Sequence, residues 1–168
     1  MKIPIVTALL LALAAPSFAG ADWASARLEN AMSAYRTGDY RTAQRGFQRL
    51  AEHGSAVAET MLGVIYAEGR GVRANPAVAA GWFRRAASRG YGPAQIALSD
   101  AFARGSGVGR DTHAAYFWAL AATIGGDRSA ETSGRSRVAA LGKHLSADTR
   151  AEIAADVHNW RPRAQRMR

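Results

Sequence analysis

The chain has 168 residues, a formal net charge of +9 and no cysteine, and arginine supplies 20 of its 22 basic residues. The lack of cysteine excludes a disulfide framework, so packed apolar faces must stabilise the fold.

The first 21 residues have the pattern of a secretory signal peptide. Lys2 precedes an apolar run over 3–15, and Pro16 and small residues follow. We expect cleavage after Ala19 or Ala21, which leaves 21 basic and 13 acidic residues, a formal charge of +8. An uncleaved membrane anchor is the alternative, but the run is shorter than the roughly 20 residues that a spanning helix needs. With no cysteine for lipid attachment, the sequence predicts a periplasmic or secreted protein.

Residues 22–57 predict a divergent N-terminal helical hairpin. Gly38, Asp39 and Tyr40 form its turn, which is five residues shorter than the turns that follow along the chain. Apolar residues recur at helical spacing on both sides of this turn. They are Leu28, Met32 and Tyr35 before it, and Ala43, Phe47, Leu50 and Ala51 after it.

The next 72 residues contain one unit twice, over 58–93 and 94–129. Aligned at an offset of 36 residues, the two copies share 10 identities in 36 positions, whereas this composition gives roughly 3 or 4 by chance, and a fixed period of this length indicates stacked repeats. The positions that define the unit are Ala58, Leu62, Tyr66, Gly69, Gly71, Val72, Trp82 and Gly90, then Ala94, Leu98, Phe102, Gly105, Gly107, Val108 and Trp118.

Each unit predicts two helices joined by a glycine turn. Ala58, Leu62 and Tyr66 recur every four residues and so line one face of the first helix. Gly69 can adopt the left-handed conformation that ends a helix. Asn75, which precedes a proline, is a suitable N-cap for the second helix, whose apolar face includes Trp82. We expect this tryptophan and its counterpart to be core residues that face the next repeat.

The spaced glycines, the valine and the tryptophan of this unit resemble the Sel-one-like repeat, a 36-residue relative of the tetratricopeptide repeat. In the first copy the matching residues are Ala58, Leu62, Gly63, Tyr66, Gly69, Gly71, Val72, Ala79, Trp82, Ala86, Ala87 and Gly90. The resemblance implies an all-α, right-handed solenoid that serves as a protein-interaction scaffold, and it suggests a bacterial source.

The repeat pattern decays after residue 129. Residues 130–160 predict a C-terminal capping hairpin, whose last helix begins after Ser146, carries Ile153, Val157 and Trp160 on one face, and ends at Pro162. Terminal repeats need a polar outer face, so departure from the repeat pattern is expected here. Residues 161–168 form a basic tail. The whole chain therefore predicts about four helix-turn-helix hairpins.

Motifs that could carry chemistry have simpler structural explanations. The glycine-rich run 105–109 aligns with the turn of the preceding repeat and lacks the lysine of a phosphate-binding loop. No metal-binding spacing links the histidines, and no serine has the context of a nucleophile. The last helix carries three acidic residues four apart, which are expected to be solvated: Asp148, Glu152 and Asp156. The sequence predicts no catalytic residue, metal or cofactor.

The excess of arginine favours an acidic partner. Anionic membrane lipid, acidic polysaccharide or an acidic protein would suit an exported basic protein, through long-range electrostatic attraction. Scattered solubilising charge is an equally good explanation. No aromatic residues interleave with the arginines, so nucleic-acid binding is not predicted.

The first helices of the repeats offer a candidate partner-binding surface, because in repeats of this kind they line the concave face. We obtain its residues by removing the buried stripe from each helix. They are Glu59, Thr60, Val64 and Glu68 in one repeat and Gln95, Ile96, Asp100 and Arg104 in the next.

Two classes of function fit these observations. The first is a non-enzymatic scaffold of the bacterial cell envelope that binds a protein partner. The alternative is an enzyme or binding protein directed at peptidoglycan or β-lactams, an activity to which cysteine-rich members of the repeat family are linked. Those members carry a cysteine pair in each repeat, and this chain has no cysteine.

Overall fold

The computed structural model describes residues 19–163, and its regular elements are all helical. The predicted signal peptide lies mostly outside these residues, so it stays a prediction. In chain order the elements are α1 (Ala19–Arg36), α2 (Tyr40–Glu52), α3 (Ala56–Glu68), α4 (Pro76–Ser88), α5 (Gly92–Arg104), α6 (Thr112–Ala122), α7 (Arg128–Leu141), the 3₁₀ turn η1 (Gly142–His144) and α8 (Ala147–Asn159). The all-α prediction is confirmed.

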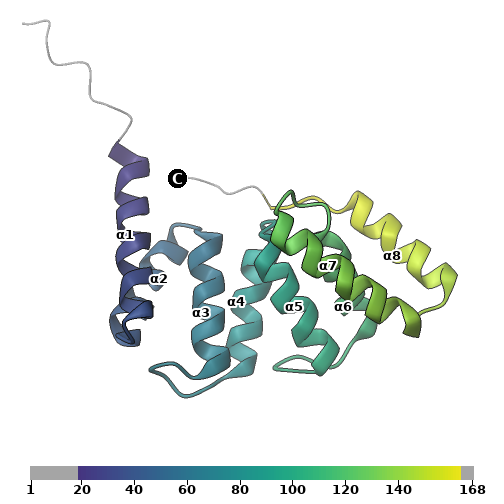
Figure 1. The fold of residues 1–168 in the computed structure, drawn as a ribbon, viewed down its shortest axis with the longest axis horizontal. Coiled ribbons are helices and arrows are strands. Elements are labelled where there is room, and N and C mark those ends of the chain that lie inside the picture. Colours follow the sequence, from purple (N-terminus) through teal and green to yellow (C-terminus); the bar gives the residue numbers. More distant parts are fainter. Residues whose placement is uncertain (1–18, 164–168) are drawn as a thin grey trace, which may run out of the picture.

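From α1 to α7 the helices stack in series, and each packs on the next one along the chain (Figure 1). The pairs α1–α2, α3–α4 and α5–α6 are hairpins. Each inner helix therefore buries one side against its hairpin partner and another against the neighbouring hairpin. This is the nearest-neighbour arrangement of a helical solenoid.

Glycines at equivalent positions set the turn of each repeat. Gly69 and Gly105 end α3 and α5 with the same left-handed backbone, at φ +70° and ψ +31°. Gly71 and Gly107 follow, both at φ +72°. A Cβ on Gly71 would lie 2.6 Å from the Cβ of Tyr40, the first residue of the preceding hairpin's second helix. These glycines thus serve both the turn and the contact between successive hairpins.

The second helices begin at side-chain caps, as the sequence predicts. The Asn75 side chain accepts a hydrogen bond from the Val78 N–H at 3.1 Å, and Pro76 occupies the first turn of α4. Asp111 accepts from the Ala114 N–H at 3.0 Å and caps α6 in the same way. Each cap satisfies an amide that has no carbonyl partner within its helix.

The two repeat tryptophans lie at the edge of the core and are half-buried. Trp82 packs against a cluster of residues from α1, α2 and α3, which includes Phe47 and Leu62. The expectation that Trp82 faces the next repeat is therefore wrong, because the ring lies on the side of α4 that faces its own partner α3. Trp118 packs against the clusters on both sides of it.

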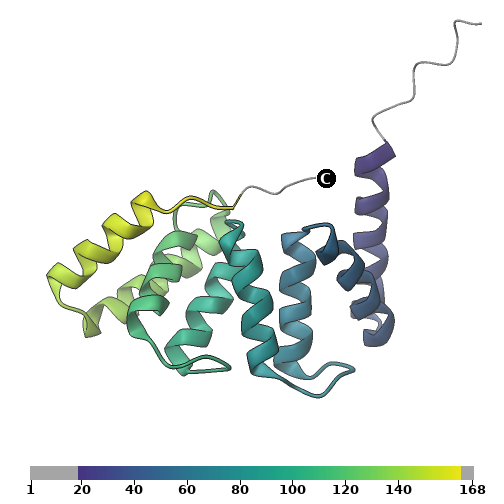
Figure 2. The same ribbon diagram turned by 180° about the vertical axis from the view of Figure 1, so that it is seen from behind.

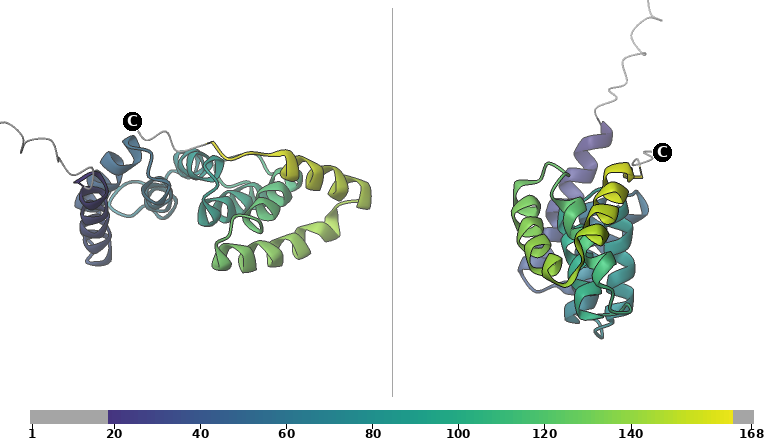
Figure 3. Two further views of the ribbon diagram at one scale, coloured as in Figure 1. Left: turned by 90° about the horizontal axis from the view of Figure 1, so that it is seen from above. Right: turned by 90° about the vertical axis from the view of Figure 1, so that its right-hand side faces the viewer.

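The C-terminal helices do not form a close hairpin. Figure 3 shows α7 and α8 diverging, and α8 packs mainly on α6. Ile153 and Val157 of α8 are buried against Tyr116 of α6. On the other side of α6, Gly134 allows α7 to approach closely, since a Cβ there would lie 2.7 Å from the Ala119 carbonyl oxygen. The helix α6 is thereby enclosed between α7 and α8.

Candidate protein-interaction surface

The predicted partner-binding residues all lie on α3 and α5, the first helices of the two repeats. Three of them are buried: Glu59, Thr60 and Gln95. The other five keep part of their side chains accessible, and we call them the first-helix surface. It consists of Val64, Glu68, Ile96, Asp100 and Arg104.

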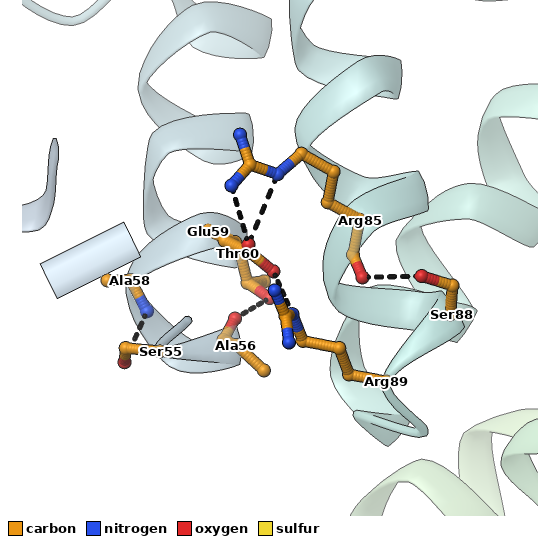
Figure 4. Close-up of polar contacts among 8 residues, drawn as sticks. All are labelled: Ser55, Ala56, Ala58, Glu59, Thr60, Arg85, Ser88 and Arg89. Carbon is orange, nitrogen blue, oxygen red and sulfur yellow. Dashed lines mark hydrogen bonds and ion pairs between the residues drawn. The ribbon is translucent and has the colours of Figure 1, made fainter. Parts of the chain in front are cut away.

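The Glu59 carboxylate is fully buried and lies between Arg85 of α4 and Arg89, the C-cap residue that follows α4, as Figure 4 shows. Its Oε1 pairs with Arg85 Nη2 at 3.1 Å, and its Oε2 pairs with Arg89 Nε at 3.2 Å. The expectation that Glu59 is free for a partner is therefore wrong. The side chain lies in the first turn of α3, which is next to the last turn of the antiparallel helix α4, so its charge is satisfied inside the hairpin.

Thr60 and Gln95 are also turned inward, against expectation. The Thr60 hydroxyl donates to the Ala56 carbonyl at 2.8 Å. The Gln95 side-chain amide donates to the Ala87 carbonyl at 3.4 Å, and its Oε1 has no partner in the described chain. Removing one apolar stripe from each helix underestimates its buried face. Both α3 and α5 are covered by two second helices, so the buried arc is wider than one stripe.

Asp100 connects two first helices. Its carboxylate accepts two hydrogen bonds from Arg137 of α7, from Nε at 2.6 Å and from Nη2 at 2.7 Å. These bonds raise the pKa of the Arg137 guanidinium. Arg104 lies on the outside of the pair, 3.9 Å from the same carboxylate. Arg137 was not predicted, because no repeat position or local spacing marks it.

Glu68 belongs to an aromatic and basic cluster at the turns. It pairs with Arg70, whose guanidinium lies over the rings of Tyr35 and Tyr40 at 5.3 and 5.6 Å. Arg70 also donates to the Tyr40 hydroxyl at 3.1 Å. Burial, and then the nearby Glu68 carboxylate, raise the pKa of the Tyr35 hydroxyl. The cluster joins the turn of the first hairpin to the turn of the second.

The other candidates for chemistry have structural roles in the described chain. Gly107 of the glycine-rich run lies against Pro76, as a repeat turn should. The acidic residues of α8 are solvent-exposed, as expected. Within residues 19–163, no three His, Asp or Glu side chains are grouped as a metal site would require. No helix in the same range has the length and apolar character needed to cross a membrane.

The stacked hairpins with glycine turns and capped second helices define a helical-repeat protein of the tetratricopeptide-like class. The Sel1 repeat model matches residues 56–91 and 92–127. A Sel1 repeat protein from Oxalobacter formigenes is 31% identical with a TM-score of 0.58, over 67% of this chain and 88% of that one. The chain therefore belongs to the Sel1 repeat family.

A second solved structure matches over a longer stretch. It is a protective antigen present in uropathogenic Escherichia coli strains, described as displaying an SLR fold. The identity is 27% and the TM-score 0.70, over 80% of this chain. The match covers 28% of that protein, so this chain spans less than a third of its length. No curated protein sequence matched the chain.

Proposed function

We propose that the chain is an exported, non-enzymatic scaffold of the bacterial cell envelope, and that its first-helix surface binds a protein partner. Membership of the Sel1 repeat family supports the general class, since such repeats generally act as protein-interaction scaffolds. The predicted signal peptide supports export. The formal charge of +8 that remains after its removal favours an acidic partner, through long-range attraction.

One observation carries the proposal. Several buried positions keep their residue type between the repeats, as Leu62 and Leu98 do. The accessible positions of the same helices change chemistry, from valine to Asp100 and from glutamate to Arg104. A surface that recognises one specific partner needs such a pattern, because each repeat must present a different side chain to that partner.

A charge exchange tests the surface without altering net charge. In the variant Glu68→Arg with Arg104→Glu, each repeat carries the charge of the other. The matched control, Arg150→Glu with Glu152→Arg, makes the same exchange on the exposed side of α8. We expect cross-linking in envelope extract to capture one stoichiometric partner with the wild type and the control, and about tenfold less with the first-helix exchange. Equal capture by both variants would contradict the surface, and capture of no partner would contradict the scaffold.

Export is tested separately by the mass of the mature chain. The protein, produced in a Gram-negative host with its own N-terminus, is expected in the periplasmic fraction with its mass shortened by 19 or 21 residues. A full-length chain retained in the cytoplasm would contradict export and leave the partner surface to be judged by the capture experiment.

A further inference from the structure

Residues 160–163, here called the C-terminal segment, leave α8 and run back in extended conformation over the ends of α6 and α4 (Figure 2). The Trp160 ring meets Trp118 edge to face at a centroid distance of 5.8 Å, and Phe117 at 6.4 Å. Pro162 lies against Gly90, where a Cβ would be 3.1 Å from the proline Cγ. The Arg163 N–H donates to the Ser88 carbonyl at 2.8 Å.

The first repeat fills the equivalent places with its own side chains. Arg85 stacks on Trp82, with its guanidinium carbon 4.5 Å from the ring centroid. Arg89 lies beside Gly54, 3.5 Å from the position of a Cβ there. Thirty-six residues further on, the places of these two arginines are taken by alanine and Gly125.

The second repeat therefore lacks the two arginines that cover Trp82 and Gly54. Trp118 and Gly90 correspond to the tryptophan and glycine that the arginines cover one repeat earlier. The second repeat has no arginine at these two places; Phe117 meets Trp118 edge to face at a centroid distance of 5.1 Å, and the C-terminal segment contacts both Trp118 and Gly90. The Ser88 carbonyl belongs to the last turn of α4 and has no donor within its helix, so it is available to an incoming backbone amide.

We propose that Ser88, Gly90 and Trp118 form a binding site for an extended peptide that carries tryptophan, then proline two residues later. The ligand is a segment of a partner protein, and the chain's own C-terminal segment occupies the site in competition with it. The contacts support this specificity: an aromatic ring on an indole, a proline on a bare glycine, and one main-chain hydrogen bond. The Arg161 side chain donates only to the carbonyls of His158 and Trp160, so the site does not recognise the side chain between the tryptophan and the proline. The identity of the ligand as a protein rests on the proposed scaffold function.

The test uses the full-length chain with its own segment released, by Trp160→Ser with Pro162→Ser. An amidated peptide of residues 159–163 is titrated into the ¹⁵N-labelled protein, with the Trp118 indole N–H and the Gly90 amide as reporters. A tethered competitor has an effective concentration of about 1 mM, so with a Kd of about 0.1 mM for the released variant we expect the peptide to bind the wild type about tenfold more weakly. Peptides with serine in place of either tryptophan or proline should not bind.

A matched pair of substitutions locates the site. Gly125→Arg, added to the released variant, places an arginine at the position equivalent to Arg89, which covers Gly54, and should abolish peptide binding. Gly109→Arg adds the same charge at an exposed turn, where the first repeat has Arg73, and should leave binding unchanged. Circular dichroism of each variant confirms that it is folded.

Three results would overturn the proposal: no peptide binding to the folded released variant, binding that ignores tryptophan and proline, or a wild-type dimer that the released variant loses. The dimer would assign the segment to a second copy of the chain. Because the peptide assay needs no envelope partner, its failure leaves the first-helix surface untouched. Failure of the charge exchange likewise leaves the peptide site untouched.

Discussion

Glu59 and Gln95 occupy the same repeat position and both are buried, but they differ in charge and in their polar partners. Glu59 is charged and has Arg85 and Arg89 beside it. In the second repeat these arginines are replaced by alanine and glycine, and the carboxylate is replaced by a neutral amide. The three changes occur together because a buried carboxylate without its arginines would be left with an unpaired charge.

Glu59→Gln should therefore destabilise the chain by about 2 kcal/mol. Loss of a partner from a fully buried ion pair costs more than this, but the Arg85 and Arg89 side chains are 51% and 23% exposed and can recover part of their hydration. Urea denaturation at neutral pH measures the change. In a background with Arg85→Ala and Arg89→Gly, which copies the second repeat, the same substitution should cost little or nothing. An equal cost in both backgrounds would show that the arginines do not stabilise the carboxylate.

Asp39 is the N-cap of α2, and its carboxyl makes the stability of the fold depend on pH. Its hydrogen bonds with Thr42 lower the pKa of the Asp39 carboxyl. A lowered folded-state pKa means that the ionised form stabilises the fold above the unfolded value of about 3.9, and that this stability is lost as the pH falls through the folded value. We expect Asp39→Asn to lower the melting temperature at pH 7, and the difference from wild type to shrink on acidification towards pH 3. A difference that is constant with pH would contradict the role of the charge; Glu52→Gln, at the other end of α2, serves as control.

The two repeats use side chains of different size where their first and second helices meet. Gly63 of α3 faces Phe83 of α4, and a Cβ at Gly63 would lie 2.4 Å from the ring. In the second repeat the equivalent residues are Ser99 and Ala119. The second repeat thus has two small residues at this contact, and the Ser99 hydroxyl donates to the Ala115 carbonyl at 2.7 Å.

Gly63→Ser should destabilise the chain by about 2 kcal/mol through overpacking against Phe83, although serine is the better helix former. Phe83→Ala alone should cost about 3 kcal/mol by leaving a cavity. The double variant copies the second repeat, so its cost should be clearly less than the sum of the two. Urea denaturation of the four proteins gives the coupling. Additive costs would mean that the two positions are not in contact.

The features that could be predicted from the sequence are those set by local spacing. The glycine turns and the caps Asn75 and Asp111 need only neighbouring residues, and the 36-residue period repeats them. The residues of the candidate site were harder to predict from the sequence, because the burial of a side chain depends on how many helices cover its face. Glu59 and Gln95 appear accessible when α3 and α5 are considered alone, and become buried once a second helix covers each of them.

At the scale of the molecule, contacts between hairpins determine where the stack can open. Most of these contacts join consecutive helices, so each region depends on its neighbours. The pair Asp100–Arg137 is different, because it joins the first helices α5 and α7 directly, across α6. Few buried residues hold α7 in place, namely Ala130 and Gly134, so this ion pair should carry much of its attachment.

Hydrogen exchange followed by mass spectrometry tests this attachment. Arg137→Met keeps most of the side-chain length and removes both bonds to Asp100, so α7 should open more often and its amides should exchange about tenfold faster. Amides in α1 to α3 should be unchanged, because no contact transmits the loss that far along the stack. Arg135→Met is the matched control, since it removes an exposed pair with Glu131 within the same helix and loosens no contact between helices. Uniformly faster exchange along the whole chain would instead mean that the stack unfolds as one cooperative unit, with the ion pair contributing only to its overall stability.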